Sequence, residues 1–390
     1  MTTVLTTTVL TTASLTASGP MAEPGALLAD GYDVALFDLD GVIYLGPDAV
    51  PGVVRATDEL LRLGKKLMYV TNNAARSAEV VVQHLRSLGY TAELDMVLSS
   101  AQVASAYLGE KLAKGTKVLV AGTENLRELI AAAGLTPVAS ADDGPEAVIL
   151  GYDPEMSWPL LDEACLAIGR GAVWYACNDD SSRPTQRGVV MGVGGMIASI
   201  RAALGGDPFT FGKPFRPMMD EAVRRTKAKC PIFVGDRIDT DIIGANQAQM
   251  DSLMVFTGVH GKHELVAAGP GERPTAIGKD VSALLLPPRR LSLASLGCRN
   301  LSERAEFFEP RGPRKVSQQA LRAENFVGQL DGGADCDGQR AVLRAGEIVL
   351  LTDPSDLESQ LSALWAVANL AWANPGIECA AALRSLDLVG

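Results

Sequence analysis

The sequence predicts an α/β protein whose core is a Rossmann-like parallel sheet. Short apolar runs, such as residues 34–37 and 232–234, contain no polar residue, as expected for strands that are buried on both faces. Amphipathic stretches of helical periodicity lie between these runs. Several runs are followed at once by Asp or Thr. Since open α/β sheets bind ligands at the carboxyl ends of their strands, these side chains predict a functional site there.

Length and charge limit the possibilities further. At roughly 150 residues per domain, 390 residues predict two or three domains. The chain carries 35 Lys and Arg against 46 Asp and Glu, a net charge of −11. Such a charge repels nucleic acids and anionic membranes, so neither is an expected partner. An anionic substrate would have to meet a local positive site.

Three features of the sequence predict a cytoplasmic protein. The first 20 residues are rich in Thr and lack the Lys and Arg of a signal peptide, so residues 1–30 are expected to form a disordered tail. The most apolar stretch, residues 361–373, is shorter than the roughly 18 residues that a membrane span needs. The six cysteines are scattered without a CxxC pair, which favours reduced thiols.

The expected strands and helices alternate along the chain. Residues 77–88 form one such helix, because Val81, Leu85 and Leu88 share a stripe and Gly89 suits its C-terminal cap. A strand, a helix and another strand thus form the repeating unit. The expected strands are residues 34–37, 67–70, 118–121, 148–150, 232–234 and 253–256.

The first candidate motif is FDLDGVIY at residues 37–44. Residues i and i+2 of an extended chain point the same way, so Asp38 and Asp40 converge, and Gly41 lets the backbone pass close to a bound group. Paired carboxylates suit Mg²⁺, which prefers oxygen ligands. Taken alone, such a pattern is more often a strand-end Asp that caps the next segment.

The second and third candidate motifs contain no acidic residue. Thr71 and Asn72 come directly after a predicted strand and could hydrogen-bond phosphate oxygens, although a turn has the same composition. Lys213 lies in a GKP sequence, where its ammonium could meet a phosphate. It is not a Walker A lysine, since Asp207 stands where that motif needs glycine and Pro214 replaces Ser or Thr. A lone lysine is otherwise a surface residue.

The fourth element is GDRIDTDI at residues 235–242. Asp236 at a strand end can complete the shell of a cation. Asp239 or Thr240 is expected to cap a helix that begins at Asp241. So many acidic and hydroxyl groups in a short segment repel one another unless a cation is near.

These four elements, in this order, resemble those of the haloacid dehalogenase-like hydrolases, in particular the subfamily with a large type 2 cap. The resemblance covers residues 31–287 and implies Asp38 as the nucleophile and Asp40 as the general acid and base. It also implies that Thr71, Asn72 and Lys213 hold the phosphoryl group.

The resemblance implies a metal site as well. Asp38, the backbone carbonyl of Asp40 and Asp236 would bind Mg²⁺, while Asp241 would support the metal-bound waters or Lys213. A carboxylate nucleophile divides hydrolysis into two easier steps through an aspartyl-phosphate. Lys213 and Mg²⁺ would supply the positive site that an acidic protein needs for an anionic substrate.

The chain between the second and third motifs is too long for a loop. We therefore expect an inserted α/β cap domain at residues 112–206, between two parts of the core at 31–111 and 207–290. By the same resemblance, Asn178, Asp179 and Asp180 of the cap would contact the leaving group of the substrate. A polar turn between strand and loop is the equally simple alternative.

Residues 291–390 are expected to form a small α+β domain. A helix is predicted to open at Asp353-Pro354 and to stop at residues 374–376. The domain is weakly similar to a truncated acetyltransferase-like domain on some actinobacterial members of the family. It lacks the R-x-x-G-x-G/A loop that cradles the pyrophosphate of coenzyme A, so a regulatory or packing role is expected instead of acetyl transfer.

Together these inferences predict a Mg²⁺-dependent phosphatase for a small phosphomonoester. The resemblance favours glycerol 3-phosphate as the substrate. Phosphoglycolate, a nucleoside monophosphate or a sugar phosphate stays an alternative, as does a phosphatase whose C-terminal domain senses a ligand. A homodimer is compatible with the sequence but not required by it.

Overall fold

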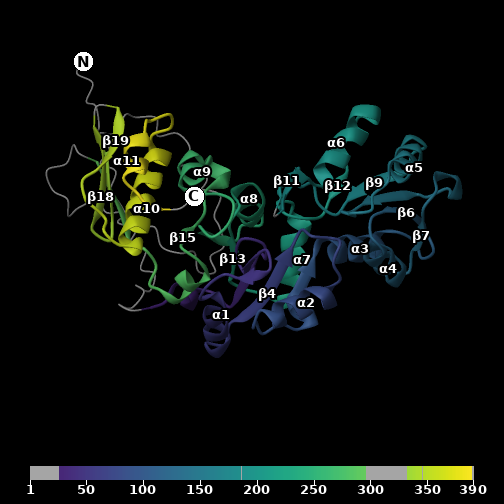
Figure 1. The fold of residues 1–390 in the computed structure, drawn as a ribbon, viewed down its shortest axis with the longest axis horizontal. Coiled ribbons are helices and arrows are strands. Elements are labelled where there is room, and N and C mark those ends of the chain that lie inside the picture. Colours follow the sequence, from purple (N-terminus) through teal and green to yellow (C-terminus); the bar gives the residue numbers. More distant parts are fainter. Residues whose placement is uncertain (1–25, 186, 296–331, 345, 389–390) are drawn as a thin grey trace, which may run out of the picture.

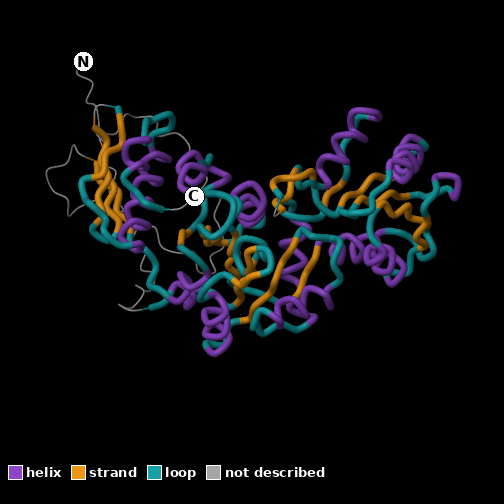
Figure 2. Tube along the Cα trace, in the orientation of Figure 1, coloured by secondary structure: helices purple, strands orange, loops and turns teal. Residues whose placement is uncertain are grey.

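The computed structural model describes residues 26–185, 187–295, 332–344 and 346–388. They form three parts in a row: a central core, a part built from residues near 117–210, and a C-terminal part that is yellow and light green in Figure 1. Figure 2 separates the orange strands into the same three groups. Each part has its own sheet, so the organisation follows the predicted plan of a core, an inserted cap and a tail domain.

The core is a six-stranded sheet in the order β15-β14-β13-β1-β4-β5, and all of its strand pairs are parallel. Four strands correspond to predicted apolar runs. The other two, β5 and β15, have three residues each, too few to show a pattern in the sequence. The strands are β1 (Val34–Phe37), β4 (Lys66–Thr71), β5 (Val97–Ser99), β13 (Pro231–Gly235), β14 (Asp251–Val255) and β15 (Ala276–Gly278).

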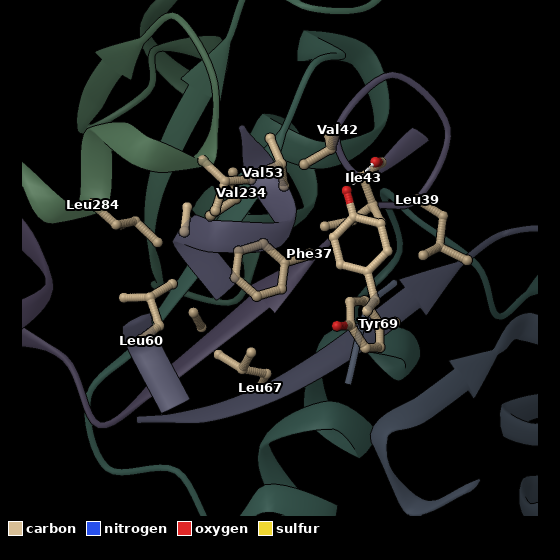
Figure 3. Packing of buried hydrophobic residues seen from close by; sticks show 14 of the residues in the cluster. Phe37, Leu39, Val42, Ile43, Val53, Leu60, Leu67, Tyr69, Val234 and Leu284 are labelled. Atoms are coloured by element: carbon tan, nitrogen blue, oxygen red, sulfur yellow. Dashed lines mark hydrogen bonds between the residues drawn. The ribbon is translucent and has the colours of Figure 1, made fainter. Parts of the chain in front are cut away.

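Helices cover both faces of the core sheet, which explains the fully apolar strands. Phe37 of β1 points to the face covered by α1 and α2, whereas Leu36 points to the face covered by α3 and α7. Figure 3 shows the Phe37 ring at the centre of the first cluster, with Leu60 and Leu284 on one side and Tyr69 on the other. These helices are α1 (Val53–Arg62), α2 (Ala78–Ser87), α3 (Ser100–Lys111) and α7 (Arg216–Thr226).

The predicted helix at residues 77–88 is confirmed as α2. Ser77 caps its N-terminus by accepting a hydrogen bond from the Val80 N–H. Gly89 follows with φ of +93°, a conformation that glycine adopts without strain.

The cap sheet has five parallel strands in the order β12-β9-β8-β6-β7. The predicted boundary at residue 206 leaves out β12, which pairs with β9 and leads the chain toward Lys213. A two-residue strand has no periodicity from which it could be predicted. The cap elements are β6 (Lys117–Ala121), α4 (Glu124–Ala132), β7 (Thr136–Val138), β8 (Ala147–Leu150), α5 (Trp158–Gly169), β9 (Val173–Ala176), β10 (Ser182–Thr185), β11 (Gly188–Met191), α6 (Val193–Leu204) and β12 (Phe209–Thr210).

The C-terminal part is an antiparallel sheet, β16-β17-β18-β19, against which α10 packs. The predicted helix start at Asp353-Pro354 is wrong: α10 begins at Leu357, because Asp356 accepts the Ser359 N–H at 2.9 Å and forms a capping box. Its end at Ala373 agrees with the predicted stop. The elements are β16 (Leu291–Ser295), β17 (Gly332–Cys336), β18 (Gln339–Arg344), β19 (Glu347–Leu350), α10 (Leu357–Ala373) and α11 (Ala380–Arg384).

The C-terminal part shares a hydrophobic cluster with the core. Helix α10 packs against α9 (Lys262–Ala267), and Trp372 of α10 donates its indole N–H to the Leu265 carbonyl at 3.0 Å. Ile238 and Ile242 of the core belong to the same buried cluster. The core and the C-terminal part are therefore joined by one continuous apolar contact.

The N-terminal expectation needs one correction. Leu28 and Ala29 are buried, and the Leu28 N–H donates to the Leu286 carbonyl at 2.7 Å, so the predicted tail of residues 1–30 overlaps the fold. Residues 1–25 lie outside the described ranges. Among the described residues, no helix is long and apolar enough to cross a membrane.

Candidate active site

The candidate site lies where two neighbouring strands at the centre of the core sheet end. Asp38 follows β1 and Asp236 follows β13, and these strands pair side by side. From β1 the chain builds the sheet outward through β4 and β5, and it then returns to the other side of β1 as β13. Ligand sites of α/β proteins lie at such a reversal of strand order.

Three buried carboxylates meet at this point. Asp38, Asp236 and Asp241 each place an oxygen within 4.8 Å of the others. Loss of hydration raises the pKa of Asp38 well above its usual value, and Asp241 and Asp236 raise it further while Lys213 lowers it. Burial, followed by the charge of Asp241, raises the pKa of Asp236 to about 7. The cluster thus holds negative charge that lacks full compensation.

Lys213 lies directly against this cluster. Its Nζ is 2.6 Å from Asp38 Oδ1 and 2.8 Å from Asp241 Oδ1, and its side chain is 2% exposed. Burial lowers the pKa of the Lys213 ammonium, but Asp241 and Asp38 outweigh it, and the net pKa is raised. The lysine therefore stays protonated and fixes the position of the Asp38 carboxylate.

Two glycines allow the backbone to approach Asp236. Gly41 has φ of +91°, and a Cβ there would lie 2.6 Å from Asp236 Oδ2. A Cβ at Gly258 would lie 1.9 Å from the same oxygen. The neighbouring Val259 N–H donates to Oδ2 at 2.7 Å. Gly41 was expected from its motif, whereas Gly258 was not, although Gly258 also lies just after a predicted strand.

The residues present fit a divalent cation. Asp236 Oδ1 is buried and has no hydrogen-bond partner within the described part of the chain. Leaving a buried carboxylate oxygen unpaired is unfavourable unless a ligand completes it. Three carboxylates against one ammonium leave a negative excess, and an all-oxygen donor set suits a small, hard cation.

Asp40 stands apart from the three carboxylates. Its side chain is reachable by solvent, although protein atoms surround most of it. This desolvation raises the pKa of Asp40, and the charges of Arg76, Lys213 and His84 lower it. Arg76 is an exposed residue in the loop after β4, and no motif in the sequence points to it.

Thr71 is the last residue of β4 and Asn72 follows it, but the two residues differ in their contacts. The Thr71 hydroxyl accepts the Asn73 N–H at 3.1 Å. The Asn72 amide nitrogen donates to the Lys213 carbonyl at 2.9 Å and to Asp180 Oδ1 at 3.1 Å. Its oxygen accepts the Lys213 N–H at 2.7 Å. A direct bond from the Asn72 side chain to a phosphoryl group would have to replace one of these contacts.

The three cap residues do not all converge on the cluster. Asn178 is buried and donates its amide N–H to the Asn72 carbonyl at 2.7 Å, and its oxygen accepts the Asp180 N–H at 3.2 Å. Burial raises the pKa of Asp179, the charge of Arg201 lowers it and that of Asp239 raises it. Asn178 and Asp180 thus join the cap to the core.

Comparison with known proteins identifies the family. Two models of haloacid dehalogenase-like hydrolases match residues 35–136 and 210–284. The D-glycerol 3-phosphate phosphatase of Mycobacterium tuberculosis is 44% identical over 267 residues, which are 68% of this chain and 75% of that protein. The chain belongs to the haloacid dehalogenase-like hydrolases.

Solved structures of related hydrolases differ in how much of the chain they match. The magnesium complex of a glycerol phosphate phosphatase from M. tuberculosis has a TM-score of 0.74 at 34% identity and covers 93% of this hydrolase and 99% of its own chain. A p-nitrophenyl phosphatase from Archaeoglobus fulgidus covers 65% of this hydrolase and 98% of its own chain, with a TM-score of 0.61 at 27% identity. The likeness to the mycobacterial structure thus extends over most of the hydrolase.

One local expectation about the fourth motif of this hydrolase is wrong. Helical structure begins at Ile238, as a π-helical segment (Ile238–Ile242), and neither Asp239 nor Thr240 caps a helix at Asp241. Asp241 Oδ2 itself accepts the Arg237 N–H at 3.1 Å, while Asp239 forms an ion pair with Arg237 at 2.6 Å. Asp241 thus stabilises the turn at Arg237 with one carboxylate oxygen and pairs with Lys213 through the other.

Proposed function

We propose that this hydrolase is a Mg²⁺-dependent phosphatase that acts on small phosphomonoesters through an aspartyl-phosphate on Asp38. One observation carries the proposal: the Asp38 carboxylate lies 2.6 Å from the buried Lys213 ammonium and in one cluster with Asp236, whose Oδ1 has no hydrogen-bond partner among the described residues. An anionic nucleophile needs such neutralising charge to approach an anionic phosphate.

The residues divide the reaction between them. An Asp38 oxygen forms a bond to phosphorus as the bond to the leaving oxygen breaks, and Asp40 gives its proton to that oxygen. Asp40 then takes a proton from water, which attacks phosphorus and releases phosphate and the Asp38 carboxylate. A carboxyl whose pKa is raised by burial, as that of Asp40 is, suits both proton transfers.

The positive charges would be arranged around the phosphoryl group. Lys213 pairs with Asp38 and stabilises the charge on the phosphoryl oxygens, together with the Thr71 hydroxyl at the end of β4. Asp38, Asp236 and the Asp40 carbonyl would hold Mg²⁺, which when bound offsets negative charge on phosphate. Asp241 pairs with Lys213 at 2.8 Å and keeps it in place.

Glycerol 3-phosphate is the proposed substrate. The supporting observation is the 44% identity to a D-glycerol 3-phosphate phosphatase, together with the likeness over 93% of the chain to a glycerol phosphate phosphatase structure. Phosphoglycolate is the first alternative, since a phosphoglycolate phosphatase of Arabidopsis thaliana is 31% identical. Sugar phosphates are the second, because an acid sugar phosphatase of Staphylococcus haemolyticus is 32% identical.

A substrate panel tests the proposal. Phosphate release from glycerol 3-phosphate, phosphoglycolate, nucleoside monophosphates and sugar phosphates would be measured with and without Mg²⁺, and Asp38→Asn would be the control. We expect the highest kcat/KM for glycerol 3-phosphate and no turnover by the variant. Activity that survives in Asp38→Asn, or that needs no divalent cation, would disprove the mechanism.

Location and assembly are separate parts of the proposal. All five cysteines in the described ranges are free, which supports a reducing compartment such as the cytoplasm. The homodimer stays a prediction, which analytical ultracentrifugation of the full chain tests.

A further inference from the structure

We propose that Asp180 of the cap is a positioning residue for Lys213, on which it acts through the side-chain amide of Asn72. The inference rests on the proposed function and deepens it. It differs from the prediction that Asp180 contacts the leaving group, because it assigns Asp180 a role in every turnover, whatever the leaving group is.

The first step is the pairing between Asn72 and the backbone of Lys213. The amide oxygen accepts the Lys213 N–H at 2.7 Å, and the amide nitrogen donates to the Lys213 carbonyl at 2.9 Å. Both groups are buried, so water does not compete for these bonds. A lysine side chain has four rotatable bonds, and a fixed backbone is what allows its ammonium to reach Asp38 reproducibly.

The second step is the contact of Asp180 with that amide. An amide nitrogen has two protons, and Asn72 gives the second one to Asp180 Oδ1 at 3.1 Å. A carboxylate only accepts hydrogen bonds, so a flipped Asn72 amide would place two oxygens against each other. Asp180 therefore favours the orientation in which Asn72 pairs correctly with both sides of Lys213.

The third step is the close packing around Asn72 and Lys213. The Asn72 carbonyl accepts the Asn178 amide N–H and the Ser100 hydroxyl, both at 2.7 Å. A Cβ at Gly212 would lie 2.6 Å from the Asn72 amide oxygen and 2.8 Å from the Cys177 carbonyl. A shift of Asn72 would therefore be transmitted to Lys213 and would not be absorbed nearby.

The test compares Asp180→Ala with Asp180→Asn. Alanine removes the acceptor of the Asn72 proton, whereas asparagine removes the charge and keeps an acceptor oxygen. Steady-state kinetics would use glycerol 3-phosphate and p-nitrophenyl phosphate, whose leaving groups share no feature beyond the ester oxygen. Binding of inorganic phosphate in the presence of Mg²⁺ would be measured by calorimetry, since phosphate has no leaving group at all.

We expect Asp180→Ala to lower kcat by about tenfold for both substrates and to weaken phosphate binding, the scale of one lost buried hydrogen bond. Asp180→Asn should stay within about threefold of the unmodified protein. Asp142→Ala is the matched control, because Asp142 is a cap carboxylate that pairs only with the exposed Arg170 in the described structure and lies outside the site. It should change neither quantity.

A double-mutant cycle keeps the proposal testable even if Asp180→Ala perturbs the cap. If Asp180 acts through Asn72, then Asp180→Ala has no further effect on kcat in an Asn72→Ala background. Multiplicative effects would overturn the proposal, as would a KM raised for one substrate with phosphate binding unchanged. If the substrate panel finds no turnover, the phosphate titration still shows whether Asp180 affects phosphate binding. A failure of the Asp180 proposal can therefore be told apart from a failure of the proposed function.

Discussion

The cap and the C-terminal domain are joined to the core in different ways. The cap shares a buried apolar cluster with the core, to which Leu126 of the cap and Leu98 of the core belong. It also makes polar contacts near the site, such as the 2.7 Å bond from Asn178 to the Asn72 carbonyl and the 3.3 Å bond from Asn125 to the Ala74 carbonyl. The C-terminal domain packs an apolar helix, α10, against α9 on the other side of the core. The polar contacts of the cap thus lie at the candidate active site, whereas the junction with the C-terminal domain lies away from it.

This difference predicts different consequences of change. Hydrogen bonds depend on direction and act on specific atoms, so a change in the polar contacts between cap and core should alter the rate. Apolar burial is non-directional, so a change at the C-terminal junction should alter stability first. Packing links the C-terminal junction to the site, because Ile238 and Ile242, close to Asp241 in the sequence, belong to the cluster that contains α10.

Removal of the C-terminal domain should have the largest effect. A chain that ends at residue 290 exposes the buried Leu265 and Ile277 along with much of α9. Several such side chains, at about 1.5–3 kcal/mol each, predict a loss of about 5 kcal/mol or more. Thermal unfolding measures it, and aggregation is expected on heating. An unchanged melting temperature would break the comparison and favour an independent ligand-sensing module.

The next largest effect should come from Lys213→Met. This variant removes the cation that contacts Asp38 and leaves that carboxylate and Asp241 unpaired. The loss of one preorganised charge at a reacting centre predicts a decrease in kcat of about 10²–10³-fold. Arg216→Met, which removes an exposed cation three residues away, is the control. A decrease below tenfold would contradict the role of Lys213.

Stability should depend on pH differently with and without Mg²⁺. The raised pKa of Asp236, about 7, means that the folded carboxyl holds its proton at a pH where the unfolded one has lost it. Without metal, this group therefore lowers stability as the pH rises from about 4 to about 7. Bound Mg²⁺ needs the ionised form, so its apparent affinity should rise about fivefold between pH 6 and 7 and about twofold more above pH 7.

Melting curves with EDTA or Mg²⁺ between pH 5.5 and 8.5 measure this linkage. The shift in melting temperature that Mg²⁺ produces should grow with pH up to about 7. An equal shift at pH 6 and pH 8 would show that Asp236 is ionised throughout and would remove it from the linkage.

The smallest effect should come from Trp372→Phe. This change keeps an aromatic ring at the C-terminal junction but removes the 3.0 Å hydrogen bond to the Leu265 carbonyl. We expect a loss of about 1 kcal/mol in the free energy of unfolding and an unchanged kcat. Trp158→Phe, at an exposed position of the cap, is the control. A lower kcat would show that the C-terminal junction affects the reaction rate, as the polar contacts of the cap are expected to do.

The central part of the site could be predicted because parallel strands end at one edge. Asp38 and Asp236 follow apolar runs in the sequence, so their meeting follows from the sheet alone. The sequence left open whether Asp241 supports metal-bound waters or Lys213, and the structure places its carboxylate 2.8 Å from the lysine.

Other features depend on contacts that have no local signal. The Asn72 amide is engaged by Lys213 and Asp180, both more than 100 residues away. The sequence predicted a hydrogen bond from Asn72 to phosphate oxygens and gave no sign of these two partners. The start of α10 was misplaced because Asp353 and Asp356 are both suitable caps, and the partner at Ser359 decides between them. The role of Gly258 could be recognised only from its close approach to the Asp236 carboxylate.

Strand β12 has a consequence for exchanging caps between related hydrolases. The strand belongs to the cap sheet, where Phe209 pairs with Tyr175, yet Lys213 follows it after only two residues. A chimera joined at residue 206 would combine a foreign β9 with the native β12, and any mismatch of register would displace the lysine. Joining after Pro214 would transfer the lysine with the sheet that aligns it, so recombination of these enzymes should succeed more often at that point.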